Sequence, residues 1–453
     1  MVEESTLAET TVFDIGFTER PPWWESLILA IQNIPAMTGM FLFPGLIGAS
    51  FHLAPAVIAG LYGATFVTCG LVTFLQGTFL LRLPIVMGPW AATYVVIVAG
   101  GHAFGLGAAY GSFFVAALIW VLLSLPVAGG ALAGWLARVF RDPIVFGGLI
   151  VIAMAYLSTI SLSNWVGTPA QVGFGAANWV GGAVCIVIIF LALLFGRGLL
   201  RRGAVVLGII GGTLAYAIFK PIPLSRLAAS EWFYVPHPFQ FGFSVQPLLV
   251  FFFFLMLTAS ASSTLSLYHL VSRWGNDDPS NTRMSAGIFS SSVGAAIAAV
   301  LGGLSTNAYP DNIGILKSTR IGSVFVTSLA GLILLLLGFV LKFDTLFIII
   351  PSNVIAAAAT VMFGIILASG IEMLRQVRWD TINSLVFGFS FLVSMGGLFV
   401  SPQTLKTYPT LVQTVISQPL LTGTFLIIVL HLLLNGGVRR LGQRAAATSV
   451  GQA

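Results

Sequence analysis

Long apolar segments separated by short polar connections repeat along the whole chain of 453 residues. Each segment is roughly 20 residues long, which is the length that an α-helix needs to cross the hydrocarbon core of a bilayer. Fourteen segments are predicted, with centres near residues 37, 65, 92, 117, 152, 187, 211, 258, 294, 311, 330, 357, 391 and 424. The pattern predicts an all-α polytopic membrane protein without a separate soluble domain.

Two of these segments are short and interrupted by Pro and Gly. The third contains Met-Gly-Pro-Trp-Ala at residues 87–91, and the tenth contains Tyr-Pro-Asp-Asn-Ile-Gly at residues 309–314. Pro removes a backbone donor and breaks a helix. The half-helix that follows then begins with free N–H groups and a positive dipole end. Because the breaks occupy corresponding positions in the two halves of the chain, they indicate a binding site near the bilayer midplane, although ordinary proline kinks are the alternative.

The connection after the seventh segment divides the chain into halves of seven segments each. An odd number per half gives the halves opposite orientations, which predicts an inverted repeat. The expected organisation is an N-terminal tail over residues 1–24, a first repeat over 25–220, an outer connection over 221–245, a second repeat over 246–436 and a C-terminal tail over 437–453.

Positive charge predicts the orientation. With the N-terminus in the cytoplasm, sixteen of the 20 Lys and Arg residues fall on the inner side and four on the outer side, namely Lys220, Arg226, Lys342 and Lys406. This bias follows the positive-inside rule and places both termini in the cytoplasm. The formal net charge of +6 is therefore explained by cytoplasmic loops rather than by nucleic-acid binding.

Composition agrees with a membrane protein. Hydrophobic residues make up 57% of the chain, charged residues 8%, and the mean hydropathy is +1.00. The acidic first 20 residues lack the features of a cleavable signal peptide. Cys69 and Cys185 both lie in apolar segments, which argues against a disulfide and against a metal site. No cluster of metal ligands and no nucleophile with a nearby base is evident, so an enzyme is not expected.

Asp311 is expected to be the only carboxylate deep within an apolar stretch. An ionisable group at membrane depth is energetically expensive and indicates function. Burial would raise its pKa towards neutrality and suit it to proton coupling. The alternative is a scaffolding role, in which the carboxylate caps the N-terminus of a helix.

The residues around Asp311 carry a family resemblance. Residues 311–320, Asp-Asn-Ile-Gly-Ile-Leu-Lys-Ser-Thr-Arg, resemble the signature of the nucleobase–ascorbate transporter family, also called nucleobase:cation symporter-2. Residues 32–37 and 368–371 resemble two further stretches of the family, with Asn33 at a position where the family has His. The resemblance spans nearly the whole chain and points to a bacterial purine or pyrimidine permease.

The resemblance implies a fold and a mechanism. Segments 1–4 and 8–11 would form a core domain, and segments 5–7 and 12–14 a gate domain, with short strands in the broken third and tenth segments. The protein would import a nucleobase (xanthine, guanine, hypoxanthine or uracil) by proton symport with an elevator-like movement. Sodium is the alternative coupling ion. It would work without a cofactor in the bacterial inner membrane, as a homodimer formed through the gate domain.

The resemblance also implies site residues. Those expected to touch substrate are Asp311, Ser260, Thr264, Trp90, Ala91, Pro310, Met40 and Tyr309, and those expected to support them are Gln32, Asn312, Gly314, Thr319, Gly88 and Pro89. Ser260 aligns with a Glu of the family, whereas a shift of one residue would place Ala261 there. Asp311 would then be the only carboxylate at the site, and Trp90 would offer either an aromatic face to the ligand or a packing surface to a helix.

Two other functions remain open at this point. An anion transporter of the same fold, similar to sulphate permeases or bicarbonate exchangers, would explain the missing Glu, but an ionised Asp311 would repel an anion. A facilitator for small neutral solutes would not depend on a pH gradient.

Overall fold

The computed structural model describes residues 12–34, 37, 39–126, 142–169, 174–197, 199–222, 225, 227, 231–233, 235–309, 312, 315–316, 319–405, 407–408, 412–413, 416 and 419–438. Asp311, Pro310 and Gly314 lie outside these residues, as do both ends of the chain. The predictions made for those three positions therefore stay predictions.

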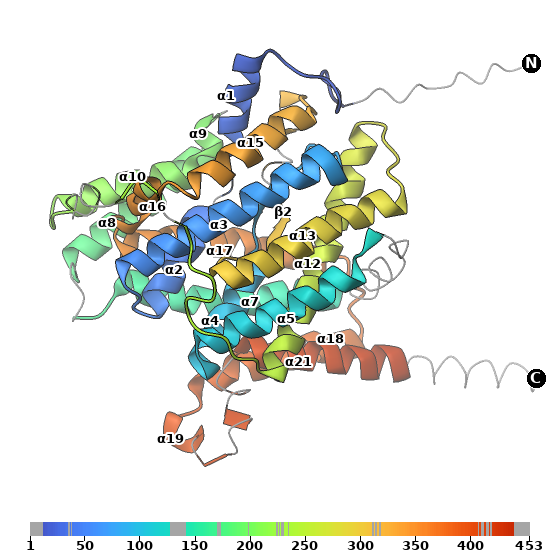
Figure 1. Cartoon of the computed structure of the whole chain (residues 1–453). Coiled ribbons are helices and arrows are strands. Elements are labelled where there is room, and N and C mark those ends of the chain that lie inside the picture. Colours follow the sequence, from blue (N-terminus) through green and yellow to red (C-terminus); the bar gives the residue numbers. More distant parts are fainter. Residues whose placement is uncertain are drawn as a thin grey trace, which may run out of the picture.

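The described residues are mainly helical, and Figure 1 shows the helices as one bundle. The first half contains α1 (Trp23–Asn33), α2 (Gly39–Ser50), α3 (Pro55–Leu75), a π-helical turn (Gln76–Leu80), β1 (Met87–Pro89), α4 (Ala91–Phe104), α5 (Leu106–Leu123), α7 (Pro143–Val166), α8 (Ala176–Leu194), α9 (Leu199–Arg202) and α10 (Ala204–Ala217). The second half contains α12 (Pro247–Trp274), α13 (Asn281–Leu301), β2 (Thr306–Ala308), α15 (Val324–Leu337), α16 (Leu341–Ile348), α17 (Ser352–Leu374), α18 (Thr381–Gly396), a 3-10 turn (Gly397–Phe399), α19 (Pro402–Leu405), α21 (Pro419–Leu430) and a final π-helical stretch (His431–Val438).

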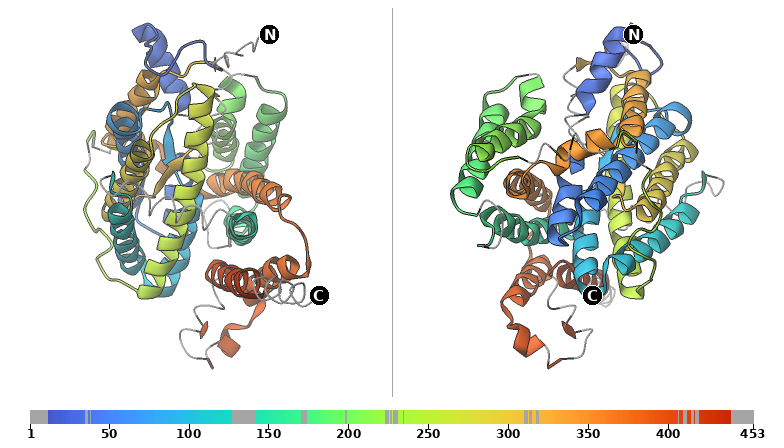
Figure 2. Two further views of the ribbon diagram at one scale, coloured as in Figure 1. Left: turned by 90° about the vertical axis from the view of Figure 1, so that its right-hand side faces the viewer. Right: turned by 60° about the vertical axis from the view of Figure 1, so that its left-hand side comes forward.

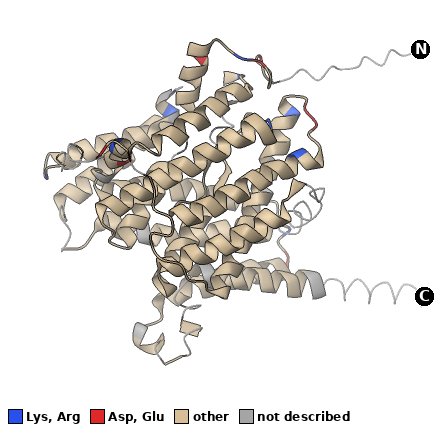
Figure 3. Ribbon diagram, in the orientation of Figure 1, with Lys and Arg blue, Asp and Glu red and all other residues tan. Residues whose placement is uncertain are grey.

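Eight of these helices are long and apolar enough to cross a bilayer, and five shorter apolar helices accompany them in the described part of the chain. Helices lie over twelve of the fourteen predicted centres; the first centre, residue 37, falls between α1 and α2, and the tenth, residue 311, lies outside the described residues. Charged residues are concentrated in connections and at helix ends (Figure 3). The chain is thus a multi-pass membrane protein, as the hydrophobic pattern predicts.

The helices divide into two groups. In the strand-bearing group, α3 packs against α15 and α13, and α5 packs against α12 and α13. In the second group, α7 and α8 pack against α17, α8 packs against α10, and α18 packs against α21. Figure 2 shows the second group along one side of the first, with α18 and α21 at one end. The two groups meet where α2 contacts α17 and where α4 contacts α7 and α21.

Close helix contact in the strand-bearing group depends on glycine. A Cβ atom at Gly70 of α3 would lie 2.2 Å from the backbone nitrogen of Leu335 in α15. Such small residues let the backbones of membrane helices approach closely. Close van der Waals packing then stabilises the helix pair, because the hydrophobic effect does not drive helices together within a lipid bilayer. This tight crossing fixes the helices that hold the two strands.

The strands form an antiparallel pair in the middle of the strand-bearing group, at the two predicted breaks. Met87 pairs with Ala308, Gly88 with Asn307 and Pro89 with Thr306. All six residues are buried. Because unpaired backbone groups are costly in an apolar interior, pairing the two broken segments with each other satisfies groups that a broken helix leaves free.

Candidate functional site

The strand pair positions the start of α4. Beyond the paired residues, the Trp90 N–H donates to the Ser305 carbonyl at 2.9 Å and the Tyr309 N–H donates to the Val86 carbonyl at 3.1 Å. The side chains of Thr93 and Ser305 are also hydrogen-bonded to each other. These bonds continue the contact between the two broken segments beyond each end of the strand pair. They thereby fix the start of α4, directly after Trp90.

Helix α12 contacts β2 through hydroxyl groups one turn apart. The Thr264 hydroxyl is hydrogen-bonded to the Asn307 Oδ1, and the Ala308 N–H donates to the same hydroxyl at 3.3 Å. The Ser260 hydroxyl lies 3.5 Å from the Asn307 Oδ1. All three side chains are buried. This network fixes which way the Asn307 amide faces, because its oxygen points towards α12.

Tyr309 connects the strand pair to α2. Its hydroxyl accepts the Gly39 N–H at 3.0 Å. Its ring covers Gly88, where an added Cβ atom would lie 2.3 Å from the ring. The absence of a side chain at Gly88 therefore creates the space that the Tyr309 ring occupies.

A small cavity lies where the two helix groups meet. Its volume is about 70 Å³. It is lined by Trp90, Ala91, Ala92, Met256 and Ala259 from the strand-bearing group and by Leu149, Ile150, Ala153, Met154 and Ile366 from the second group. The cavity thus lies between the start of α4 and the middle of α12, beside Ser260, and none of the described residues that line it is charged.

Asn33 and Asn312 fasten α1 to the residues that follow β2. The Asn312 side-chain amide donates to the Asn33 Oδ1 at 2.9 Å and to the Asn33 carbonyl at 3.0 Å. Both residues are buried. Asn33 therefore contacts the signature stretch directly, through Asn312. Gln32 is half-buried, and the Thr319 hydroxyl donates to the Ile315 carbonyl within its own turn.

The structure brings together Ser260, Thr264, Trp90, Ala91, Tyr309, Gly88 and Pro89 around the strand pair. Two expectations need adjustment. The Trp90 N–H, which precedes the half-helix α4, donates to the Ser305 carbonyl and is therefore not one of the free N–H groups expected at this break. Met40 is fully buried in an apolar cluster with Tyr62, Phe66 and Val86, and it is absent from the lining of the described cavities.

Two buried polar residues, one in the strand pair and one away from it, were not foreseen from the sequence. Asn307 was not singled out, because an amide in an apolar stretch carries no charge to attract notice. Asp344 was not singled out either, and the structure shows it fully buried in α16. The expectation that Asp311 is the only deeply placed carboxylate is therefore wrong.

The sequence of this chain matches a known protein family. The family model Xan_ur_permease, described as Permease family, matches residues 25–403. The chain belongs to this permease family. Its members are transporters rather than enzymes, in agreement with the expectation of no catalytic centre. The match also confirms the resemblance that the signature around Asp311 indicates.

Sequence similarity to characterised relatives extends over most of the permease. The uric acid permease PucK of Bacillus subtilis is 29% identical over 421 residues, which cover 89% of this chain and 94% of PucK. The uracil permease of the same organism is 27% identical, covering 85% and 89% of the two chains. The xanthine permease XanQ of Escherichia coli is 25% identical, covering 93% and 94%.

A solved structure supports the fold. Murine Slc26a9, an anion transporter captured in an inward-facing state, matches with a TM-score of 0.61 over 92% of this chain and 69% of its own. The sequence identity is 12%. At that level the likeness shows a shared fold and carries no information about substrate.

Proposed function

We propose that this permease imports a planar nucleobase by proton symport. The observation that carries the proposal is the strand pair held by Thr264 and Asn307 beside a cavity whose described lining is apolar. A ligand site of this type needs flat apolar walls and a few oriented polar groups. Trp90 and Met256 supply the walls, and Ser260, Thr264 and Asn307 lie at the neighbouring helix. The relatives that transport uric acid, uracil and xanthine support the same substrate class.

The lack of cationic side chains among the described lining residues favours a nucleobase over an inorganic anion. Anion sites generally gather cationic side chains or several free backbone N–H groups. No Lys, Arg or His lines the described cavity at Trp90, and the Trp90 N–H is occupied by Ser305. A pure facilitator is the other alternative, and it is distinguished by its independence of a proton gradient.

The size of the cavity supports a mechanism in which the helix groups move. Small-molecule sites occupy about 300–1,000 Å³, whereas this cavity has about 70 Å³. In the proposal, the strand-bearing group is the core domain and the second group is the gate domain. An elevator-like displacement of the core would open the cavity to substrate, as expected for fourteen spans in two inverted repeats with core segments 1–4 and 8–11.

We further propose that the permease lies in the bacterial inner membrane as a homodimer, with both termini in the cytoplasm. The outer faces of α8 and α18 expose large apolar side chains, including Phe190, Leu194, Phe389 and Leu392. These faces suit contact with lipid and, at the gate domain, with a second copy. We propose that transport needs no cofactor. The coupling ion is a proton, and sodium is the alternative ion.

Ligand-dependent stabilisation tests the substrate class. Purified protein would be heated with xanthine, guanine, hypoxanthine, uracil or uric acid, and in parallel with sulphate or bicarbonate. A ligand that binds only the folded state increases the free energy of unfolding, by about 2.7 kcal/mol when its concentration is one hundred times Kd. The unfolding temperature rises accordingly. We expect at least one base to stabilise the protein. Stabilisation by an anion and by no base would overturn the proposal.

Asp311→Asn tests the coupling ion. We expect accumulation of base in proteoliposomes under an imposed proton gradient to fall at least tenfold, because Asn cannot carry the proton. Binding, measured by thermal shift, should survive in part because Asn keeps the shape of the side chain. An imposed sodium gradient serves as the control, and an unchanged dependence of uptake on pH would contradict the coupling role.

A further inference from the structure

Asp344 is a buried carboxylate that the transport site does not use. It lies in α16, a short helix between α15 and α17 that is separate from the helices suited to cross the bilayer. Its side chain is fully buried, and neither carboxyl oxygen has a hydrogen-bond partner among the described residues. A buried polar group in a folded protein normally has such a partner, so this exception requires an explanation.

The carboxyl group is pressed against the backbone of α3. A Cβ atom at Gly63 would lie 2.9 Å from the Asp344 Oδ2 and 2.7 Å from the Gly338 carbonyl oxygen. The aromatic neighbours are also close, since the ring of Phe347, one turn later in α16, stacks on Tyr62 at 5.0 Å. The close packing of α16 thus holds Asp344 away from water.

The ionisable groups around α16 do not neutralise Asp344. From α3, the Tyr62 hydroxyl donates to the Phe41 carbonyl at 3.1 Å, and Cys69 is a buried thiol. On α16 itself, the Lys342 Nζ lies 4.6 Å from the centre of the Trp232 ring. Glu231, next to that Trp, is exposed. The described helices α2 and α15 contribute no acidic or basic side chain. No salt bridge to Asp344 is present in the described part of the chain.

The neutral acid is the form that this environment accepts. An ionised carboxylate without water or a partner is strongly disfavoured in an apolar interior, and the group binds a proton instead. Burial accordingly raises the pKa of the Asp344 carboxyl to about 9. The folded protein would therefore hold a proton at Asp344 in neutral solution, where an unfolded chain would have released it.

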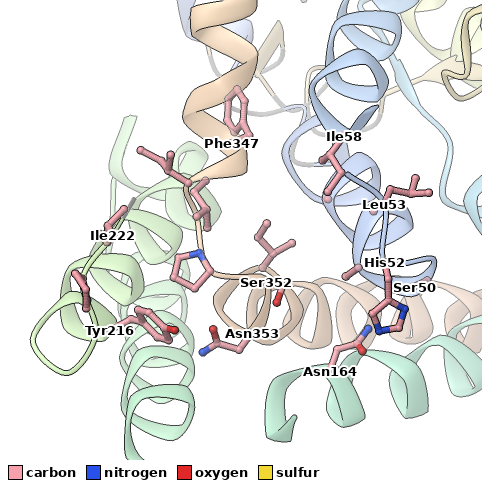
Figure 4. A pocket seen from close by; sticks show the side chains of 18 of the residues that line it. Ser50, His52, Leu53, Ile58, Asn164, Tyr216, Ile222, Phe347, Ser352 and Asn353 are labelled. Atoms are coloured by element: carbon pink, nitrogen blue, oxygen red, sulfur yellow. The ribbon is translucent and has the colours of Figure 1, made fainter. Parts of the chain in front are cut away.

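Helix α16 also contributes Phe347 to the wall of a large cavity, and the residues that follow the helix continue this wall. This cavity, of about 820 Å³, opens between α2, α7, α10 and α17, and its lining includes Phe347, Ile349, Ile350 and Pro351. Figure 4 shows Phe347 at the end of its helix, with Asn353 and Tyr216 below and Ile58 opposite. A change in the packing of α16 against α3 would consequently move this wall.

We propose that Asp344 is a proton-binding site, separate from Asp311, and that its proton keeps α16 packed against α3 at the wall of the large cavity. Ionisation would place an unpaired negative charge beside the α3 backbone and would destabilise the packing of α16 against α3. The site would thereby link pH to the shape of the cavity. This inference does not depend on which substrate the permease carries.

The test is the pH dependence of thermal unfolding of the purified permease, with Asp344→Asn as the variant. Because the folded state binds more protons than the unfolded state between about pH 4 and 9, stability should fall as pH rises through that range. We expect the unfolding temperature of the unmodified protein to drop between pH 6 and 9 and the drop to be clearly smaller in Asp344→Asn. Asp278→Asn, at an exposed position, is the matched control and should behave like the unmodified protein.

Asn is a neutral mimic of the protonated acid, so Asp344→Asn should fold. Equal pH dependence of Asp344→Asn and the unmodified protein would overturn the proposal, and so would a failure of Asp344→Asn to fold when Asp278→Asn folds. Infrared spectroscopy supplies a direct readout. The carboxylic-acid C=O band at pH 7 should be clearly weaker in Asp344→Asn than in the unmodified protein and unchanged in Asp278→Asn, and equal bands in Asp344→Asn and the unmodified protein would also overturn the proposal.

Discussion

Gly88→Ala is expected to reduce uptake of base severely although it adds a single methyl group. The new Cβ atom would lie 2.3 Å from the Tyr309 ring, a distance at which something must shift. The ring cannot simply rotate away, because its hydroxyl accepts the Gly39 N–H at 3.0 Å. Overpacking of this kind costs about 1–3 kcal/mol, and here it would displace the strands beside the cavity. We expect the initial rate of uptake in proteoliposomes to fall by roughly a hundredfold.

Two further variants separate this effect from general damage. Gly364→Ala makes the same change in α17, where an added Cβ atom has nothing within 4 Å, and should leave uptake unchanged. The double variant Gly88→Ala/Tyr309→Ala removes the clashing ring and should recover part of the uptake. If Gly88→Ala alone transports at the unmodified rate, the strand pair does not control the site in the way described.

Much of this arrangement can be predicted from the sequence. The apolar segments and the positions of the two breaks follow from hydropathy and from Pro and Gly, because these residues restrict the backbone whatever surrounds them. The pairing of residues 87–89 with 306–308 is different, since it joins segments more than two hundred residues apart. Short strands at the two breaks were expected from the family resemblance, but their pairing with each other was not, and no local pattern of residues would have indicated it.

Asn307 and Asp344 show what the sequence does not reveal. The importance of Asn307 comes from its contact with Thr264 on another helix, and an Asn in an apolar stretch does not show which helix it will meet. Asp344 stands in Leu-Lys-Phe-Asp-Thr-Leu, which is typical of a solvent-exposed connection between spans. Only the packing of α16 against Gly63 buries it. In both cases the tertiary contact, rather than the residue type, decides the environment.

Thr264→Val is expected to weaken transport strongly, whereas Thr264→Ser is expected to preserve it. Val keeps the shape of Thr but removes the hydroxyl, which would leave the Asn307 Oδ1 with only the 3.5 Å contact from Ser260. It would also remove the group that accepts the Ala308 N–H. A buried polar group without its partner costs about 1–3 kcal/mol, which corresponds to roughly ten- to a hundredfold in an equilibrium constant. We expect KM for the base to rise by that factor.

A double-mutant cycle with Asn307→Ala shows whether the two residues act as a unit. If Thr264 acts by orienting the Asn307 amide, Asn307→Ala should impair transport as much as Thr264→Val, and the double variant should be little worse than either single variant. Additive losses would mean that Thr264 contacts the base independently of Asn307. Equal transport by the Val and Ser variants would show that the hydroxyl is not required, and the site would then have to be sought away from the contact between α12 and β2.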